Sequence, residues 1–269
     1  MSRPQVSVII PTYNRKYALG ELLESLARQS VQEFEVIVIN DDGEPVDQLK
    51  ENFSELELKF INLKVNQCHV HARNEGISHA KGEFIMLCDD DDLVTPNHLE
   101  RMLEEIKDAD LVYSDVEMVE YKWEGTQRVP LNRIVFAYEF DKEFMRKFST
   151  YVSSGCLYRR SLHNRIGLFD VEMNNYWDWD FILRVLEGFK VKRVAIASVL
   201  YAFSSNGDNQ SLNLSEKRNQ YLKRLCDKHH LGYLPQKNFF TLLEEPEVMA
   251  KIAQTQRVWD GEKILSRLL

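Results

Sequence analysis

Cysteine is scarce and scattered in this chain of 269 residues. The four cysteines, Cys68, Cys88, Cys156 and Cys226, form neither a Cys-x-x-Cys pair nor a spacing typical of a zinc site. A chain of this length buries enough apolar surface to fold without disulfide bonds. We therefore expect reduced thiols and a cytoplasmic location.

Long hydrophobic runs and an excess of basic residues are missing too. The longest apolar runs, such as residues 6–10, are far shorter than the roughly 20 residues that span a bilayer, and no charged and apolar leader precedes them. The net charge is −8 and the pI about 5.5. These features argue against a transmembrane segment, a signal peptide and non-specific nucleic-acid binding. An acidic protein that binds a diphosphate needs a local cation, either clustered Arg and Lys or a metal ion.

The first half of the chain alternates short β-rich runs with helical periodicities. The predicted strands are residues 6–10, which end at Pro11, and then 34–40, 58–62, 83–87 and 111–116. Between them lie predicted helices at residues 19–26, 72–80 and 99–106, the second closed by Gly82 as its C′ residue and the third entered through Pro96 in its first turn. This order predicts an α/β fold with a mostly parallel sheet that helices cover on both faces.

The pattern loosens after about Val119. Residues 120–150 are rich in aromatic and charged side chains without a clean period. A helix is predicted across residues 181–186, strands at 191–196 and 199–203, and helical structure over most of the last 50 residues. With no internal repeat and no Pro/Gly-rich linker, the chain is interpreted as one α/β domain with a helical C-terminal appendage.

Three polar clusters follow predicted strands: Pro11 to Asn14, Asp41 to Gly43, and Asp89 to Asp92. In an open α/β sheet, ligands bind outside the carboxyl ends of the strands. We therefore expect these clusters to converge on one crevice.

The run Asp89-Asp90-Asp91-Asp92 follows an apolar strand directly. Out of context, such a run is a solvated loop or a helix N-cap. Four adjacent carboxylates repel one another, however, and a divalent cation with hard oxygen ligands removes that cost. In an extended segment, alternate residues point the same way, so Asp89 and Asp91 are expected to face the ligand together. The run therefore predicts a Mg²⁺ or Mn²⁺ site.

Asp41 and Arg73 each allow two interpretations. Asp41 is either an ordinary residue of an Asp-Gly turn or an acceptor for a nucleotide base N–H. Arg73 lies close to the positive end of a predicted helix. There it either contacts a nucleotide base or phosphate, or it only pairs with an Asp or Glu at the surface. The nearby His69 and His71 form a His-x-His pair without further ligands and are left out of the site.

The segment Asn175-Tyr176-Trp177-Asp178-Trp179-Asp180 opens a predicted helix. One interpretation makes Asp178 or Asn175 the helix N-cap, with aromatic neighbours in the core. The other makes Asp178 a general base, framed by tryptophan rings that pack on sugars. The spacing alone does not decide between them.

In order and spacing, four segments resemble the family 2 glycosyltransferases, which have the GT-A nucleotide-sugar fold. The segments are VSVIIPTYNR, FEVIVINDDG, HARNEGISHAKGEFIMLCDDDDLVTP and YWDWDFILRV. The resemblance covers roughly residues 5 to 205. It divides the domain at residues 1–210 into a nucleotide-binding half (about 1–118) and an acceptor half (about 119–210), followed by the helical extension at 211–269.

The resemblance also implies a role for single residues. It places four residues around the nucleoside: Pro11, Tyr13, Asp41 on the base, and Arg73. Through the family's DxD pattern, Asp89 lies near the ribose and Asp91 on the metal. Asp178 is the implied catalytic base.

Three departures from the family pattern stand out. Trp177 replaces the usual Glu of the segment that carries the base. No histidine occurs at residues 204–211, where many members carry a metal ligand, so the metal relies on Asp91, phosphates and water. The Gln/Arg-rich tryptophan motif of processive synthases is also absent, which favours single transfers over polymerisation.

The sequence thus predicts an inverting glycosyltransferase that depends on Mn²⁺ or Mg²⁺. It would move a sugar from UDP or dTDP to a hydroxyl of a glycan, a lipid-linked or a small-molecule acceptor, in glycan or cell-surface polysaccharide biosynthesis. A homodimer and a peripheral membrane association stay open. One alternative is a nucleotidyltransferase, but the segment PTYNRKYALG lacks the Gly-rich basic loop expected there. The other is a non-catalytic nucleotide- or glycan-binding protein with the same fold.

Overall fold

The computed structural model describes residues 4–203, 214–237 and 239–268. In this part of the chain, ten strands form one sheet in the order β10-β9-β6-β8-β4-β1-β2-β3, while β5 pairs with β9 and β7 with β6. The strands are β1 Val6–Thr12, β2 Phe34–Asn40, β3 Glu57–Asn62, β4 Phe84–Leu87, β5 Leu93–Val94, β6 Leu111–Glu124, β7 Gln127–Phe136, β8 Leu157–Arg159, β9 Val191–Phe203 and β10 Gln256–Arg257.

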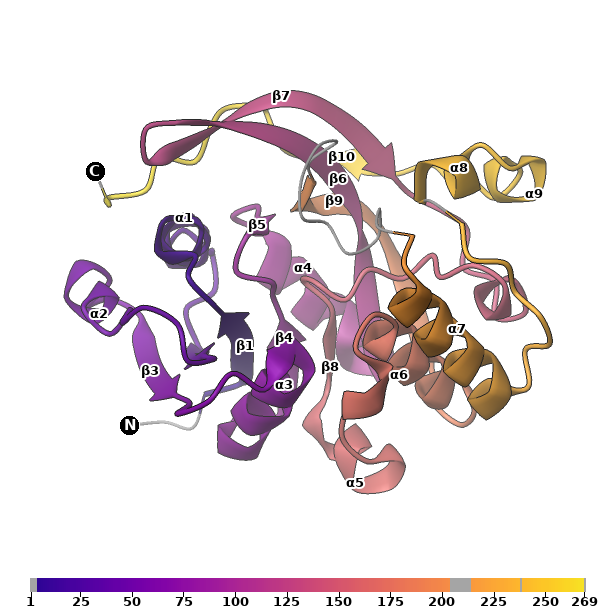
Figure 1. The fold of residues 1–269 in the computed structure, drawn as a ribbon. Coiled ribbons are helices and arrows are strands. Elements are labelled where there is room, and N and C mark those ends of the chain that lie inside the picture. Colours follow the sequence, from indigo (N-terminus) through magenta and orange to yellow (C-terminus); the bar gives the residue numbers. More distant parts are fainter. Residues whose placement is uncertain (1–3, 204–213, 238, 269) are drawn as a thin grey trace.

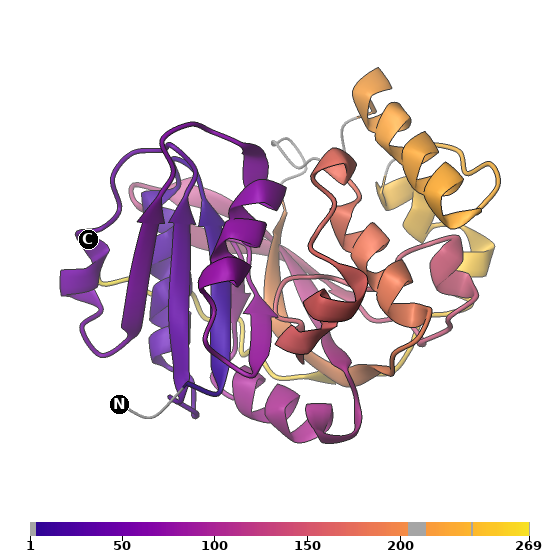
Figure 2. The ribbon, with the colours of Figure 1, turned by 90° about the horizontal axis from the view of Figure 1, so that it is seen from below.

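Helices cover the sheet on both faces (Figures 1 and 2). They are α1 Lys16–Ala27, α2 Leu49–Asn52, α3 Cys68–His79, α4 His98–Glu105, α5 His163–Ile166, α6 Trp177–Leu186, α7 Glu216–His229, α8 Phe239–Leu243 and α9 Pro246–Met249, with 3₁₀ turns at Ile106–Asp108, Phe144–Arg146, Arg160–Leu162 and Val171–Met173. None of the helices within the described ranges is both long and apolar enough to cross a membrane.

The alternation of side chains along β1 produces the layers. Val8 and Ile10 belong to the core with α1 and α4, whereas Ile9 belongs to the core on the opposite face with α3 and α6. Strands β1, β2, β3 and β4 pair in parallel. β8 then lies antiparallel to both β4 and β6 and joins the two halves of the sheet. The α/β fold with helices on both faces is confirmed, and the sheet is mixed rather than mostly parallel in its second half.

The sequence predicted that the first strand ends at Pro11, and this prediction is wrong. Pro11 pairs with Ile39 within β1, which continues to Thr12. The carbonyl of Ile9 accepts from the N–H of Cys88, directly after β4. The backbone N of Pro11, two residues after Ile9, points toward the same side of β1. The ladder between β1 and β4 ends at Ile9 and Leu87, so the missing N–H of Pro11 costs no hydrogen bond.

Two predicted helix boundaries also differ. Helix α3 ends at His79, and Gly82 lies beyond it, where an added Cβ would be 2.6 Å from the backbone N of Ser7. Gly82 is therefore needed for the close approach to β1 and not as a C′ residue. Helix α4 begins at His98, so Pro96 precedes the helix instead of forming its first turn.

The region without a clean period, residues 120–150, contains a long β-hairpin. Strand β6 continues to Glu124, turns at Gly125 with a φ of 64°, and returns as β7. The two strands predicted at 191–196 and 199–203 form one strand, β9, whose register with β6 shifts near Asp115. Figure 1 shows β7 arching over the sheet.

The expected C-terminal helical extension is helical only in part. Helix α7 is a full helix of 14 residues, but α8 and α9 are short, and most of residues 250–268 have no regular secondary structure. This segment adds β10 to the edge of β9 and returns to α1. Figure 1 shows the C-terminus beside α1.

Candidate active site

A cavity of about 580 Å³ opens where β1, β2 and β4 end. Its walls come from the loops after these strands, from α3, and from the starts of α6 and α7, together with β6, β7, β9 and α8. All seven residues predicted for the site line this one cavity: Pro11, Tyr13, Asp41, Arg73, Asp89, Asp91 and Asp178. The three polar clusters therefore converge on one crevice, although the roles of the single residues stay predictions.

The loops that follow β1 and β2 are tied together at the rim of this cavity. The N–H of Glu44 donates to Asn14 Oδ1 (2.8 Å), and the N–H of Gly43 donates to Asn40 Oδ1 (2.9 Å). A Cβ at Gly43 would lie 2.9 Å from the backbone N of Asn14, so glycine is required for this approach. The two loops thus hold Asp41 in a fixed position.

Asp41 is 3% exposed and lies just beyond the end of β2. Its Oδ1 accepts from the backbone N–H of Gln67 (2.9 Å), and its own N–H donates to the carbonyl of Thr12 (3.0 Å). Tyr13, in the neighbouring loop, is 50% exposed and lines the same cavity. A planar ligand between these side chains would meet a fixed carboxylate and a half-exposed ring.

Arg73 links the N-terminal half of the site to α6. It is buried, forms an ion pair with Asp89, and donates from Nη1 to His69 Nδ1 (2.6 Å). Its guanidinium lies 4.2 Å from the centre of the Trp177 ring. Burial and the charge of Arg73 lower the pKa of His69 to about 4, so His69 is neutral. The ring of Trp177 therefore packs against a cation at the position where the family usually has a Glu.

The aspartate run forms a turn and is not the extended segment that we expected. The N–H of Asp92 donates to the carbonyl of Asp89 (3.1 Å), which closes the turn. Asp89, Asp90 and Asp91 all line the cavity. Asp92 is buried behind them, and its Oδ1 accepts from the N–H of Ala202 (2.8 Å).

Arginines offset part of the negative charge of this turn. Arg15 forms ion pairs with Asp90 (3.3 Å) and Asp91, and Thr12 Oγ1 donates to Asp90 (2.7 Å). Burial, with a further contribution from Asp91, still raises the pKa of Asp90 to about 7. Burial also raises the pKa of Asp91, although Arg15 opposes this shift. The cluster is therefore short of positive charge.

This arrangement fits a hard divalent cation that has few protein ligands. The side chains of Asp89 and Asp91 are 32% and 30% exposed and turn carboxylate oxygens toward the cavity. No three His, Cys, Asp or Glu side chains group as a metal site within residues 4–203, 214–237 and 239–268. Mg²⁺ is often bound through one or two carboxylates, with phosphates and waters as its other ligands. The segment at 204–211, where the family histidine is missing, lies outside the described residues.

Arg128, in the β6–β7 hairpin, holds the aspartate turn from behind. Its Nη1 donates to the carbonyl of Asp91 (2.5 Å), and its Nε pairs with Glu21 of α1 (2.6 Å). Both side chains of this ion pair are buried. The hairpin thus connects α1 to the backbone of the turn.

Asp178 lies in the first turn of α6. The N-cap is Tyr176, and no side chain caps the helix, so the N-cap interpretation of Asp178 and Asn175 is wrong. Asp178 Oδ1 accepts from the N–H of Trp179 (2.8 Å). Burial raises the pKa of Asp178 to about 6, although this hydrogen bond opposes the shift. A carboxyl group with this pKa is deprotonated near neutral pH and is basic enough to accept a proton.

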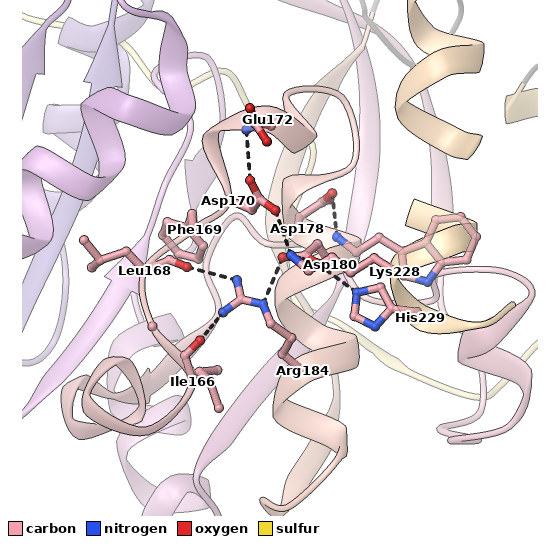
Figure 3. Close-up of polar contacts among 12 residues, drawn as sticks. Ile166, Leu168, Phe169, Asp170, Glu172, Asp178, Asp180, Arg184, Lys228 and His229 are labelled. Carbon is pink, nitrogen blue, oxygen red and sulfur yellow. Dashed lines mark hydrogen bonds and ion pairs between the residues drawn. The ribbon is translucent and has the colours of Figure 1, made fainter. Parts of the chain in front are cut away.

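Asp180, two residues later, points toward Arg184, Lys228 and His229 (Figure 3). It is fully buried and pairs with Arg184 (2.9 Å), Lys228 (2.7 Å) and His229 (2.8 Å). Asp180 therefore joins α6 to α7 and is not among the residues that line the cavity.

Four residues at or beside the cavity were not assigned to the site from the sequence: Thr12, Arg15, His69, which was considered and left out, and Arg128. Thr12 and Arg15 belong to the VSVIIPTYNR segment, so their position beside the predicted residues was a usable signal. His69 precedes Arg73 by four residues, a spacing that brings two side chains together on a helix. Arg128 lies in the region without a period and has no such signal.

Comparisons with known proteins agree with this geometry. The sequence model of the family described as "Glycosyl transferase family 2" matches residues 7–167. The uncharacterized glycosyltransferase YwdF of Bacillus subtilis (strain 168) is 54% identical over 264 residues, which cover 98% of each chain. A teichoic acid poly(glycerol phosphate) polymerase of Staphylococcus epidermidis is 27% identical over 197 residues, 68% of this chain and 26% of the relative.

Two solved structures share the fold. S. aureus TarS 1–349 in complex with UDP-GlcNAc superposes with a TM-score of 0.64 at 21% identity, over 91% of this chain and 77% of TarS 1–349. The mannosyltransferase PcManGT of Pyrobaculum calidifontis, in complex with GDP-Man and Mn²⁺, gives a TM-score of 0.62 at 18% identity, over 87% of this chain and 67% of that protein. Because the family model matches more than half of the chain and a relative is 54% identical over nearly its whole length, this chain is a glycosyltransferase and belongs to glycosyl transferase family 2.

Proposed function

We propose that this protein transfers a sugar from a UDP- or dTDP-sugar to a hydroxyl acceptor, with help from Mn²⁺ or Mg²⁺ and with inversion at the anomeric carbon. The observation that carries the proposal is the single cavity that joins Asp41, Arg73 and the aspartate turn to Asp178. The polar end of the cavity offers groups for a nucleoside diphosphate, and Asp178, next to this end, offers a carboxylate with a raised pKa.

The nucleoside would lie at the ends of β1 and β2. Pro11 and Tyr13 would flank it, and the Oδ2 of Asp41 would accept the imide N–H of uracil or thymine. The fixed backbone contact at Asp41 Oδ1 supports this role, because it holds the carboxylate in one orientation. Arg73, paired with Asp89, would lie next to the ribose and the phosphates.

Asp91, with Asp89 beside it, would hold the metal at the diphosphate. When bound, the cation would neutralise the charge that grows on the leaving diphosphate. Arg15, which pairs with Asp91 in the structure, would then be free to meet phosphate oxygens. Arg128 would keep the turn in place through the carbonyl of Asp91.

Asp178 would take the proton from the acceptor hydroxyl. That hydroxyl would attack the anomeric carbon from the face opposite the diphosphate, and one displacement gives one inversion. A positioned general base of this kind contributes typically ~10²–10⁴-fold to the rate. Trp177 and Trp179 flank Asp178 in the sequence. Trp177 packs on Arg73 and Trp179 donates to the carbonyl of Met145, and these contacts would hold the start of α6 in place beside the donor.

The similarity to a teichoic acid polymerase supports a role in cell-surface polysaccharide biosynthesis. The UDP-GlcNAc bound to TarS, which shares the fold, favours a UDP-sugar donor. A cytoplasmic location fits the use of a nucleotide sugar. Homodimer formation and peripheral membrane association stay open in this proposal.

The proposal is tested by the thermal stability of the protein with UDP, dTDP and GDP, each in Mn²⁺ and in EDTA. UDP or dTDP should raise Tm markedly more with Mn²⁺. Asp91→Ala should abolish the difference between Mn²⁺ and EDTA. Asp41→Asn should weaken nucleotide binding and leave the Tm of the free protein nearly unchanged, because its amide oxygen still accepts from the N–H of Gln67. Equal stabilisation in Mn²⁺ and EDTA would exclude a bridging cation. Tight nucleotide binding without release of UDP from any UDP-sugar would favour a non-catalytic binding protein.

A further inference from the structure

The cavity continues beyond Asp178 into an apolar compartment. We define this compartment by six side chains: Val116, Met118, Phe136, Phe148, Phe203 and Leu242. They come from β6, β7, β9, α8 and the segment after the 3₁₀ turn at Phe144–Arg146. All residues that β6, β7, β9 and α8 contribute to the described lining are uncharged. The charged lining residues belong to the loops after β1, β2 and β4 and to α3, α6 and α7.

Asp178 lies between this compartment and the proposed donor end. On one side, Trp177 packs on Arg73, which pairs with Asp89. On the other side, Trp179 Nε1 donates to the carbonyl of Met145 (2.7 Å), three residues before Phe148. The start of α6 therefore touches both ends of the cavity and holds Asp178 at their junction.

Tyr201 of β9 marks the same junction. Its ring lies against the apolar core around β6 and β7 and lines the cavity. Burial raises its pKa well above the usual value, with further contributions from Asp92, Asp89, Asp91 and Asp178. The phenol group of Tyr201 therefore stays neutral and able to donate a hydrogen bond.

The donor end of the cavity is polar and the compartment is apolar, and this difference indicates what the compartment binds. A nucleoside diphosphate needs the polar end, with its arginines and carboxylates. A sugar needs hydrogen bonds to polar side chains in addition to aromatic rings against its faces, and the walls of the compartment provide few polar groups. We infer that the acceptor carries its reactive hydroxyl on, or next to, an apolar body, either an alkyl chain or an aromatic ring, that fills this compartment. This inference rests on the proposed function, because it treats Asp178 as the base.

The inference can be tested by isothermal titration calorimetry on the protein saturated with UDP and Mn²⁺. The probes are methyl, butyl, hexyl and octyl β-D-glucoside, each below its micelle concentration, and phenyl β-D-glucoside. Affinity should rise about fourfold per methylene until the compartment is full, with a negative heat-capacity change. An aromatic acceptor predicts that the phenyl glucoside binds at least as tightly as the hexyl glucoside, and an alkyl acceptor predicts the reverse order.

Two neighbouring residues of α8 provide a matched pair of variants. Leu242 lines the compartment, whereas Leu243 does not, and both are partly buried against the same core. Leu242→Asp should reduce octyl glucoside affinity to the level of the methyl compound, and Leu243→Asp should keep the dependence on chain length. The rise in Tm with UDP and Mn²⁺ checks in both variants that the fold and the donor end are intact.

The outcomes separate this inference from the proposed function. If UDP binds but methyl and octyl glucosides bind equally or not at all, the apolar acceptor is wrong and the donor site stands. If the chain-length series binds to a protein that does not bind UDP, the compartment is not an acceptor site and the proposed function fails with it. Loss of the chain-length dependence in both α8 variants would locate the alkyl chain elsewhere and overturn the inference.

Discussion

Asp178 and Asp180 lie two residues apart on α6 and have opposite electrostatic environments. Burial raises the pKa of Asp178 to about 6. Burial alone would raise the pKa of Asp180 as well, but the hydrogen bond from His229 and the charges of Arg184 and Lys228 lower it to about 2. One carboxyl group is thus available for proton transfer near neutral pH, whereas the other is held ionised by its partners.

The first prediction concerns Asp178. Because a base must be deprotonated, turnover of a UDP-sugar, followed by UDP release, should fall about tenfold per pH unit below pH 6. Asp178→Asn has nearly the same shape, so it should keep Tm and UDP affinity but lower turnover by about 10² or more. It should also remove the decline near pH 6. Full activity in Asp178→Asn would show that the base lies elsewhere.

Arg15 gives a second prediction, for the metal. It supplies positive charge to Asp90 and Asp91, so Arg15→Ala should lower Tm in EDTA and increase the rise in Tm that Mn²⁺ produces without nucleotide. Arg28→Ala is the control, because Arg28 is as exposed as Arg15 (48% against 46%) but pairs with Glu24, away from the cavity. An equal Mn²⁺ response in the wild type and both variants would contradict a cation at the aspartate turn.

At the residue scale, the site residues that could be predicted from the sequence are those that directly follow an apolar strand. The positions of Asp41 and Asp89 at the ends of β2 and β4 follow from the apolar runs before them, so their convergence could be predicted. The ion pair between Arg15 and Asp91 could not, because it depends on how two loops fold toward each other. The same holds for the turn at Asp89, which replaces the expected extended segment.

At the scale of elements, β1, β2 and α6 were predictable because their apolar period is local. The β6–β7 hairpin was not, since its side chains pack against several surfaces. Arg128 lies over the rings of Tyr121 and Trp123, while its neighbours in the strand face solvent or the core. Mixed surroundings of this kind leave no period of two in the sequence. The hairpin is nevertheless what joins α1 to the aspartate turn.

The contact between α6 and α7 gives a third prediction. Asp180→Asn should lower the free energy of unfolding by about 3 kcal/mol, because it removes the buried carboxylate that pairs with Arg184, Lys228 and His229. In the wild type, the folded pKa of about 2 lies below the ordinary value of Asp, so this stabilisation is present above about pH 4 and is lost as the pH falls toward 2. Urea unfolding at several pH values measures both effects.

Asp170→Asn is the matched control for this contact. Asp170 pairs with the same Lys228 but is 25% exposed (Figure 3). Its loss should cost at most about 1 kcal/mol. If the two variants are equally stable, the cluster around Asp180 contributes no more than a surface pair.

At the scale of the whole molecule, the C-terminal segment packs against α1, near the start of the chain. Arg267 pairs with Glu24 of α1 (2.8 Å) and with Glu55 (2.7 Å), and its guanidinium lies 4.6 Å from the centre of the Phe53 ring. Leu268 packs against the core formed by α1 and β1. Contacts this distant in sequence leave no local pattern, which is why the sequence predicted only a helical appendage there. The division of the chain near residue 210 stays a prediction.

The last prediction follows from these contacts of the C-terminal segment. Deleting residues 262–269 should lower the free energy of unfolding by about 2 kcal/mol, from partly exposed ion pairs and the partial burial of Ile264 and Leu268. Arg267→Ala should account for about half of that loss. The affinity for UDP with Mn²⁺ should not change, because none of the described residues after Leu242 lines the cavity. Urea unfolding and calorimetry on the same samples measure the two quantities. A weaker UDP affinity in the deletion would show that the C-terminal segment supports the donor site through α1, whereas unchanged stability would show that it only lies on the surface.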